Sequence, residues 1–246
     1  SRLSGNGQAE LAALRRAASV APNSQAVYNL ADVALNCDRP DEALTALEGL
    51  DPDKGEMRGW APYWYDLTHA YHLVGKHEAE LRAARELRRR FPDRRIGLVL
   101  EVRALAAAGD TAGVNRLLAE GATLAPNTYW SEGAAYTVAG EELQAHGYGQ
   151  TGWPYLTRAV AWLDQQLAIT PKDRSHRYWL ASALYDLGDW RRSHQVSVGL
   201  RKEFPERLDY RVLAAVGAAR LRLADTLVGT TLPHEIGAAT MLKARL

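Results

Sequence analysis

Apolar residues recur every three or four positions along most of the chain, a spacing that predicts helices rather than strands. Each apolar segment is short and is followed by a turn signal, either Gly before Lys or Asp, or a proline. The turn signals are periodic, because three pairs of them lie 34 positions apart: Gly75 and Gly109, Pro92 and Pro126, Pro171 and Pro205. The pattern therefore predicts repeated helix–turn–helix units, each closed by a proline.

The clearest unit runs from Trp64 to Pro92. Its first helix carries Trp64, Leu67, Thr68 and Tyr71, its turn is Gly75-Lys76, and its second helix ends at Phe91-Pro92. This unit resembles the tetratricopeptide repeat (TPR), in which Trp, Leu, a small residue and Tyr lie on the first helix and Pro closes the second. Glu80 stands where the family usually has Ala, so we expect the second helix of this unit to sit slightly further out.

Other units carry the same marks less completely. Tyr178 to Pro205 is a good copy, and Tyr28 to Pro52 and Ile96 to Pro126 are weaker ones. Trp130 to Pro171 is stretched by eleven residues, which we expect to form a spacer or packing loop at 147–154 between its two helices, with contact to a partner as the alternative. The segment before these units predicts a lone second helix over 9–22, and the segment after them predicts a lone first helix over 208–227.

The resemblance implies an all-α fold, a right-handed TPR-like superhelical solenoid of about five helix pairs with partial terminal repeats. We expect one domain over residues 1–246, excised from a longer protein. Gly75, Gly109 and Gly188 are expected to adopt a left-handed backbone conformation where each first helix ends. Pro92, Pro126, Pro171 and Pro205 are expected to end the second helices.

Composition narrows the function classes. The chain has 30 Lys and Arg against 29 Asp and Glu, so its formal charge of +1 does not favour nucleic acid or an anionic membrane as partner. Cys37 is the single cysteine, which excludes an internal disulfide and a Cys-rich zinc site. The sequence predicts no membrane span, and a cytoplasmic location is expected. The excess of Arg over Lys is typical of high-GC bacterial genomes.

In TPR arrays the first helices line a concave groove that binds peptides. Counting from Trp64 as the fourth place of its repeat, the groove-facing places in this chain are mostly aromatic or polar, residue types suited to a recognition surface. The predicted peptide-binding residues are Tyr28, Asp32, Tyr65, His69, His72, Arg103, Tyr178, Ser182 and Tyr185. The alternative is that the tyrosines among them complete the core between repeats.

Two more specific kinds of site find little support. TPR domains that grip a C-terminal carboxylate do so with Lys and Asn, but the corresponding places here hold Tyr28 and Asp32, then Tyr65 and His69. His69 and His72 lie on one helical face with His77 beyond the turn, yet no Cys and no His-Glu-x-x-His pattern accompanies them. The sequence does not locate a carboxylate beside them, and we expect neither a metal nor another cofactor.

Seven arginines lie between residues 82 and 95, and we expect them to form a solvated helix surface. No Gly-x-Ser-x-Gly elbow, phosphate-binding loop or other catalytic motif is present, so the protein is not expected to be an enzyme.

The sequence thus predicts a scaffold that binds a protein or peptide segment in its groove. The alternative is a regulatory or sensory TPR segment acting in cis within a larger bacterial protein, such as a kinase, cyclase or transcription regulator. Association of copies through the open terminal repeats is a further expectation.

Overall fold

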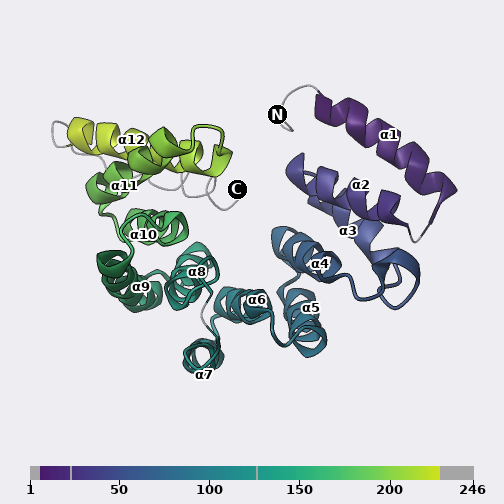
Figure 1. Cartoon of the computed structure of the whole chain (residues 1–246), viewed down its shortest axis with the longest axis horizontal. Coiled ribbons are helices and arrows are strands. Elements are labelled where there is room, and N and C mark those ends of the chain that lie inside the picture. The colour runs from purple at the N-terminus through teal and green to yellow at the C-terminus, as the bar shows by residue number, and fades with distance from the viewer. Residues whose placement is uncertain (1–5, 23, 126, 228–246) are drawn as a thin grey trace. The chain divides into compact units, whose positions relative to one another are not determined.

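The computed structural model describes residues 6–227 apart from residues 23 and 126, and those residues form helices and no strand. The all-α prediction is therefore confirmed for this part of the chain. In addition to the 3-10 helix η1 (Gly55–Met57), the α-helices are α1 (Asn6–Val20), α2 (Gln25–Asn36), α3 (Pro40–Glu48), α4 (Ala61–Leu73), α5 (His77–Arg90), α6 (Arg95–Ala107), α7 (Thr111–Gly121), α8 (Glu132–Ala145), α9 (Gly149–Ile169), α10 (Arg174–Asp186), α11 (Trp190–Glu203) and α12 (Leu208–Leu227) (Figure 1).

Short polar side chains start several of these helices. Asp110, Asp173 and Asp189 each accept a hydrogen bond from the backbone N–H three residues further on, at 2.9, 2.8 and 3.1 Å. Such caps satisfy one of the N–H groups that a helix leaves unpaired at its start. Asp110 and Asp189, which directly follow the turn glycines Gly109 and Gly188, therefore cap the next helix, whereas Lys76 after Gly75 makes no such side-chain bond.

The turn glycines have the predicted conformation. Gly75, Gly109 and Gly188 have φ angles of 71°, 73° and 86°, the left-handed region that a residue with a Cβ avoids. Helix ends also fall where proline predicts them, because α5, α9 and α11 each end two residues before Pro92, Pro171 and Pro205. The prediction for Pro126 lies outside the described residues.

The chain divides into two compact units, Ser1–Ala104 and Leu105–Leu246. In unit 1, consecutive helices from α1 to α5 pack in pairs: α1 with α2, α2 with α3, α3 with α4 and α4 with α5. Helix α2 also contacts α4. The core of this unit includes Leu11, Leu47 and Met57, all 1% exposed or less. Gly97 of α6 lies so close to α5 that an added Cβ would come within 2.7 Å of Cγ of Arg88.

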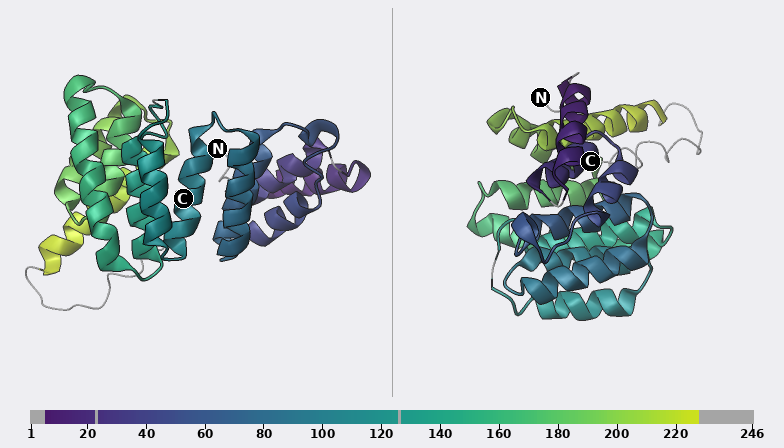
Figure 2. Two further views of the ribbon diagram at one scale, coloured as in Figure 1. Left: turned by 90° about the horizontal axis from the view of Figure 1, so that it is seen from below. Right: turned by 90° about the vertical axis from the view of Figure 1, so that its right-hand side faces the viewer.

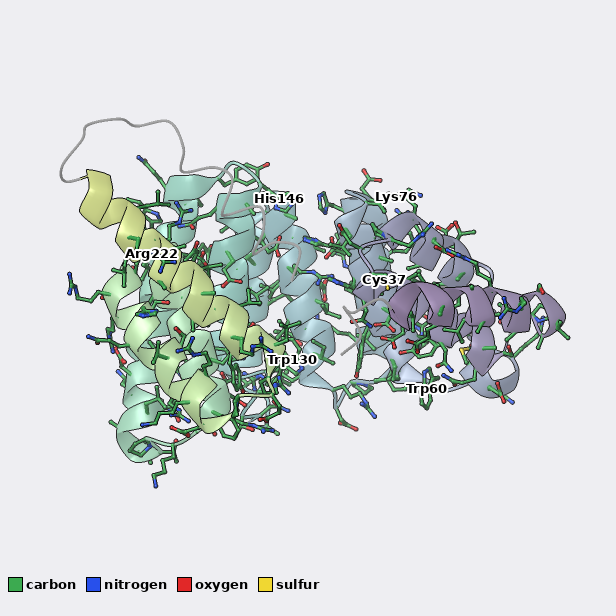
Figure 3. The ribbon with its side chains drawn as sticks, turned by 90° about the horizontal axis from the view of Figure 1, so that it is seen from above. Cys37, Trp60, Lys76, Trp130, His146 and Arg222 are labelled. Atoms are coloured by element: carbon green, nitrogen blue, oxygen red, sulfur yellow. The ribbon has the colours of Figure 1, made fainter. Side chains whose placement is uncertain are left out.

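In unit 2, the helices α8 to α12 likewise pack in order, and Figure 2 shows α8 to α11 running side by side. Alternate helices also touch, since α10 contacts both α8 and α12. Trp130 and His146 mark the two ends of α8, as Trp60 and Lys76 mark those of α4 in unit 1 (Figure 3). Within the described residues, no helix is both long enough and apolar enough to cross a bilayer.

The predicted spacer loop at 147–154 is wrong. Only residues 146–148 separate α8 from α9, and the additional residues instead lengthen α9 to 21 residues. Of the glycines that suggested a loop, Gly152 allows the two helices to approach, because a Cβ on it would lie 2.6 Å from the carbonyl oxygen of Gly140. A larger residue at Gly152 would prevent this contact between α8 and α9.

Candidate functional site

Several buried or half-buried ionisable residues lie in unit 1, on α2, α4, α5 and α6. At one end of this region Tyr28 of α2 lies near Asp66 of α4, and Trp60 packs edge-on against the Tyr28 ring at 6.1 Å between centroids. Burial raises the pKa of Asp66 to about 6, although a hydrogen bond from Tyr28 opposes the shift. Burial and the Asp66 carboxylate in turn raise the pKa of Tyr28.

Asp32 and Tyr65 extend this surface. Asn36 donates from Nδ2 to the carbonyl oxygen of Asp32 at 2.7 Å and to its Oδ1 at 3.1 Å, one turn apart on α2. Arg94, just before α6, donates to the Tyr65 hydroxyl at 3.3 Å. Asp32 and Tyr65 are both partly buried, and each accepts a hydrogen bond from a neighbouring polar side chain.

At the other end of the region, Glu80 of α5 is fully buried and has polar partners on both carboxylate oxygens. Arg103 of α6 donates from Nε to Oε1 at 2.7 Å, and a second Arg103 nitrogen donates to the carbonyl oxygen of Thr68 at 3.2 Å. The Nδ1 atoms of His72 and His77 lie 3.0 and 3.1 Å from Oε2. We refer to Glu80, Arg103, His72 and His77 as the Glu80 cluster.

The charges in this cluster explain the ionisation of Glu80. Burial by itself would raise the pKa of its carboxyl group, but hydrogen bonds from the histidines and the positive charge of Arg103 lower it to about 2. Glu80 is therefore a carboxylate at neutral pH. Glu80 is buried in place of the usual Ala because Arg103 compensates its charge inside the protein, and the expected outward position of the second helix stays a prediction.

His69 lies one turn before His72 on α4 and is neutral at physiological pH. Burial lowers its pKa to about 3, and the positive charge of Arg103 adds to the effect. Burial also lowers the pKa of His72, although its hydrogen bond with Glu80 opposes this. Both imidazoles thus present neutral nitrogen atoms near neutral pH.

The turn between α4 and α5 positions the two histidines of the Glu80 cluster. Gly75, with its positive φ, allows the chain to reverse, and its N–H donates to the carbonyl oxygen of His72 at 3.0 Å. The N–H of Lys76, labelled in Figure 3, donates to the carbonyl oxygen of Tyr71 at 2.9 Å. These bonds place the end of α4 against the first turn of α5, which carries His77 and Glu80.

The predicted site residues of unit 2 have different surroundings. Ser182 and Tyr185 are each 3% exposed. The Ser182 hydroxyl donates to Glu141 at 2.6 Å, and Arg220 donates to the Tyr185 hydroxyl at 3.1 Å. Both side chains therefore connect helices inside unit 2 and have almost no surface that a ligand could contact. For Tyr185 this agrees with the alternative that the tyrosines complete the core between repeats.

Tyr178 is partly buried on α10. Its ring packs against Trp179 and Tyr210, with centroids 5.2 and 5.8 Å apart. These contacts place Tyr178 in an aromatic cluster that joins α10 to α12.

The arginine-rich segment also differs from the expected solvated surface. Arg85 and Arg88 of α5 donate to the two oxygens of Glu101 on α6, at 2.9 and 2.5 Å, and the Glu101 side chain is only 6% exposed. Arg90 is paired with Asp53 and Glu86. Part of this segment therefore connects helices within unit 1.

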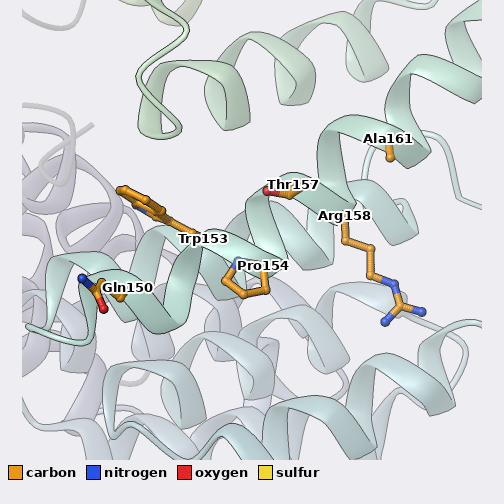
Figure 4. Close-up of a pocket in the computed structure, with 6 residues that line it drawn as sticks. All are labelled: Gln150, Trp153, Pro154, Thr157, Arg158 and Ala161. Carbon is orange, nitrogen blue, oxygen red and sulfur yellow. The ribbon is translucent and has the colours of Figure 1, made fainter.

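A second surface feature lies in unit 2, along α9. A hollow of about 730 Å³ is lined by Gln150, Trp153, Pro154, Thr157, Arg158 and Ala161 (Figure 4). All six residues belong to α9, and Trp153 is 57% exposed. The hollow is open because the residues that line it come from a single helix.

Sequence reasoning missed Asp66, Glu80 and the role of His77. Glu80 departed from the family pattern, which was the signal available, but the partner that explains it lies 23 residues away on another helix. Asp66 gave no signal, since an acidic residue on a partly exposed helix is ordinary.

Comparison with known proteins does not assign a family. No protein-family model matches the sequence, and no curated protein sequence matches it significantly.

Proposed function

We propose that this protein is a scaffold that binds peptide segments, and that its helices stack as TPR-like repeats in a right-handed superhelix. The 34-residue spacing of the left-handed Gly75 and Gly109 and the second helices that end before prolines support the repeat assignment. Direct contacts between alternate helices, α2 with α4 and α8 with α10, also support stacked hairpins.

The proposed binding surface is the first-helix face of unit 1, formed by α2, α4 and α6. The observation that carries the proposal is a set of polar and aromatic side chains on these three helices, at the places that the TPR resemblance assigns to a groove, and most of them are hydrogen-bonded to a neighbour. Its members are Tyr28, Asp32, Tyr65, His69, His72 and Arg103. Residues held in place before binding lose little conformational entropy when a ligand arrives.

The chemistry of this set favours a particular kind of ligand. Arg103 is neutralised by Glu80, and His69 is neutral at physiological pH, so these residues recognise a ligand by hydrogen bonding and packing rather than by positive charge. Asp32 adds a carboxylate at the α2 end. The expected ligand is an extended segment with aromatic or aliphatic side chains and with a basic residue near Asp32, bound with micromolar affinity, about −8 kcal/mol.

Selection from a random peptide library, followed by titration of the best peptide by fluorescence anisotropy, tests this function. Tyr65→Ala and His69→Ala are expected to raise the Kd at least tenfold, because both side chains belong to the proposed set. Trp153→Ala is the matched control, since it removes an exposed aromatic side chain from α9 in the other unit. A selected peptide whose Kd responds to Trp153→Ala but to neither unit 1 variant would contradict the proposed surface.

A further inference from the structure

The Glu80 cluster contains three potential metal ligands that converge on one point. Two imidazole Nδ1 atoms, from His72 and His77, face the same carboxylate oxygen, Oε2 of Glu80, at 3.0 and 3.1 Å. One ligand atom from each of the three residues lies within 4.8 Å of the other two. The two imidazole rings are 5.5 Å apart and are inclined at 61° to each other.

The two nitrogen-to-oxygen separations are close to those that a tetrahedral zinc ion requires. With Zn–N and Zn–O bonds of about 2.0–2.1 Å, two ligands of a tetrahedral ion lie about 3.3 Å apart. The nitrogen-to-oxygen distances in the cluster need to change by only a few tenths of an ångström to admit an ion. Two histidines and one carboxylate are also a ligand set that zinc uses in proteins, with water in the fourth position.

The surroundings of the cluster hold the ligands in place and leave a route to solvent. Arg103 binds the other oxygen, Oε1, which fixes the carboxylate so that Oε2 faces the histidines. The turn at Gly75 joins the helices that carry His72 and His77. The Glu80 side chain is fully buried, but those of His72 and His77 are 13% and 25% exposed, so an ion can reach the cluster from the side of His77.

We propose that His72, His77 and Glu80 form a binding site for a divalent transition-metal ion, with Zn²⁺ the best fit. The sequence placed His69 and His72 on one helical face with His77 beyond the turn, but it did not locate a carboxylate beside them. The structure instead brings His77 and Glu80 to His72, while Arg103 acts as a positioning residue. A bound ion would join the end of α4 to the start of α5.

Zinc titration of the tag-free protein, residues 1–246, tests the proposal. The protein is stripped with a chelator and titrated with ZnCl₂ in competition with a colorimetric zinc indicator, and Co²⁺ is then used to read the coordination geometry from its visible absorption. One Zn²⁺ is expected to bind per chain and to raise the Tm. The Co²⁺ form is expected to show the intense bands of a four-coordinate ion.

Substitutions then locate the site. His77→Ala and His72→Ala are expected to weaken Zn²⁺ binding at least tenfold and to abolish the zinc-dependent rise in Tm. His146→Ala is the control, because His146 also lies beside a carboxylate, 3.4 Å from Glu142, but forms no three-ligand group with the other residues that the structure describes. Melting in the presence of the chelator establishes that each variant is folded, and His77→Ala, at the most exposed ligand, serves if the other variant unfolds.

Two results would overturn the proposal. One is the absence of saturable binding to the wild-type chain. The other is binding that His77→Ala leaves unchanged or that His146→Ala weakens equally. Neither result bears on peptide binding, which is measured in chelator with variants of Tyr65 and His69.

Discussion

Arg103 of α6 forms an ion pair with Glu80 of α5, in which Nε lies 2.7 Å from Oε1 and the Glu80 side chain has no exposure to solvent. The same arginine reaches the backbone of α4 at Thr68. A single side chain therefore connects three helices of unit 1. Because the carboxylate is buried, its charge depends on this partner more than a surface charge would.

Replacing Arg103 is expected to be costly. Arg103→Met should lower the free energy of unfolding by about 3–5 kcal/mol, because it leaves a buried carboxylate without its ion pair. Urea denaturation followed by circular dichroism measures the change. The double variant Glu80→Leu/Arg103→Met should recover most of the loss, since neither charge remains.

Arg89→Met provides the matched control, because Arg89 is 68% exposed and pairs with Glu86 on the surface. Exposed pairs contribute about 0–1 kcal/mol. If Arg103→Met costs no more than Arg89→Met, the ion pair with Glu80 does not stabilise unit 1.

Asp66 is expected to make stability depend on pH. Its folded pKa of about 6 exceeds the ordinary value of 3.8, so between these values the folded state binds more protons than the unfolded state, and stability falls as pH rises. Asp66→Asn removes the charge and should raise the free energy of unfolding at pH 7 by about 1–2 kcal/mol. The difference from wild type should shrink as pH falls below about 4, where both states carry a protonated Asp66.

Urea denaturation at pH 7 and at pH 4 measures this difference. Asp53→Asn is the contrasting variant, because its hydrogen bond with Arg90 lowers the pKa of Asp53 and its carboxylate is favoured in the folded state. That variant should not stabilise the protein at pH 7. Destabilisation by Asp66→Asn at pH 7 would show that the Asp66 carboxylate is favoured by its surroundings.

Gly75 and Gly109 are expected to tolerate alanine unequally. Both have φ above 70°, so either substitution carries a backbone cost of about 1–2 kcal/mol. At Gly75 a Cβ meets no atom within 4 Å, whereas at Gly109 it would collide with the ring of Tyr148. Gly109→Ala should therefore lower the Tm more than Gly75→Ala, as differential scanning calorimetry can measure.

Tyr148→Ala in the Gly109→Ala background separates the two causes. The double variant removes the collision and should reduce the cost of the alanine to that of Gly75→Ala. An equal effect of the two single substitutions would mean that Tyr148 moves aside without cost.

The sequence by itself determined where the helices lie and how their turns are built. Apolar spacing and the Gly and Pro positions predict helices through local interactions, between residues a turn or less apart, and the left-handed glycines at 75, 109 and 188 confirm this reading. The same local rules failed at 147–154, where Gly152 allows α9 to approach Gly140 of α8 and does not belong to a loop.

Only the tertiary structure decided which polar side chains meet. It placed Arg103 and both histidines around Glu80, and it buried Ser182 and Tyr185, which sequence position suggested for a groove. Such encounters depend on how far each helix is rotated and how closely it approaches its neighbours. Those quantities are set by packing among residues distant in the chain, so the spacing within one helix does not reveal them.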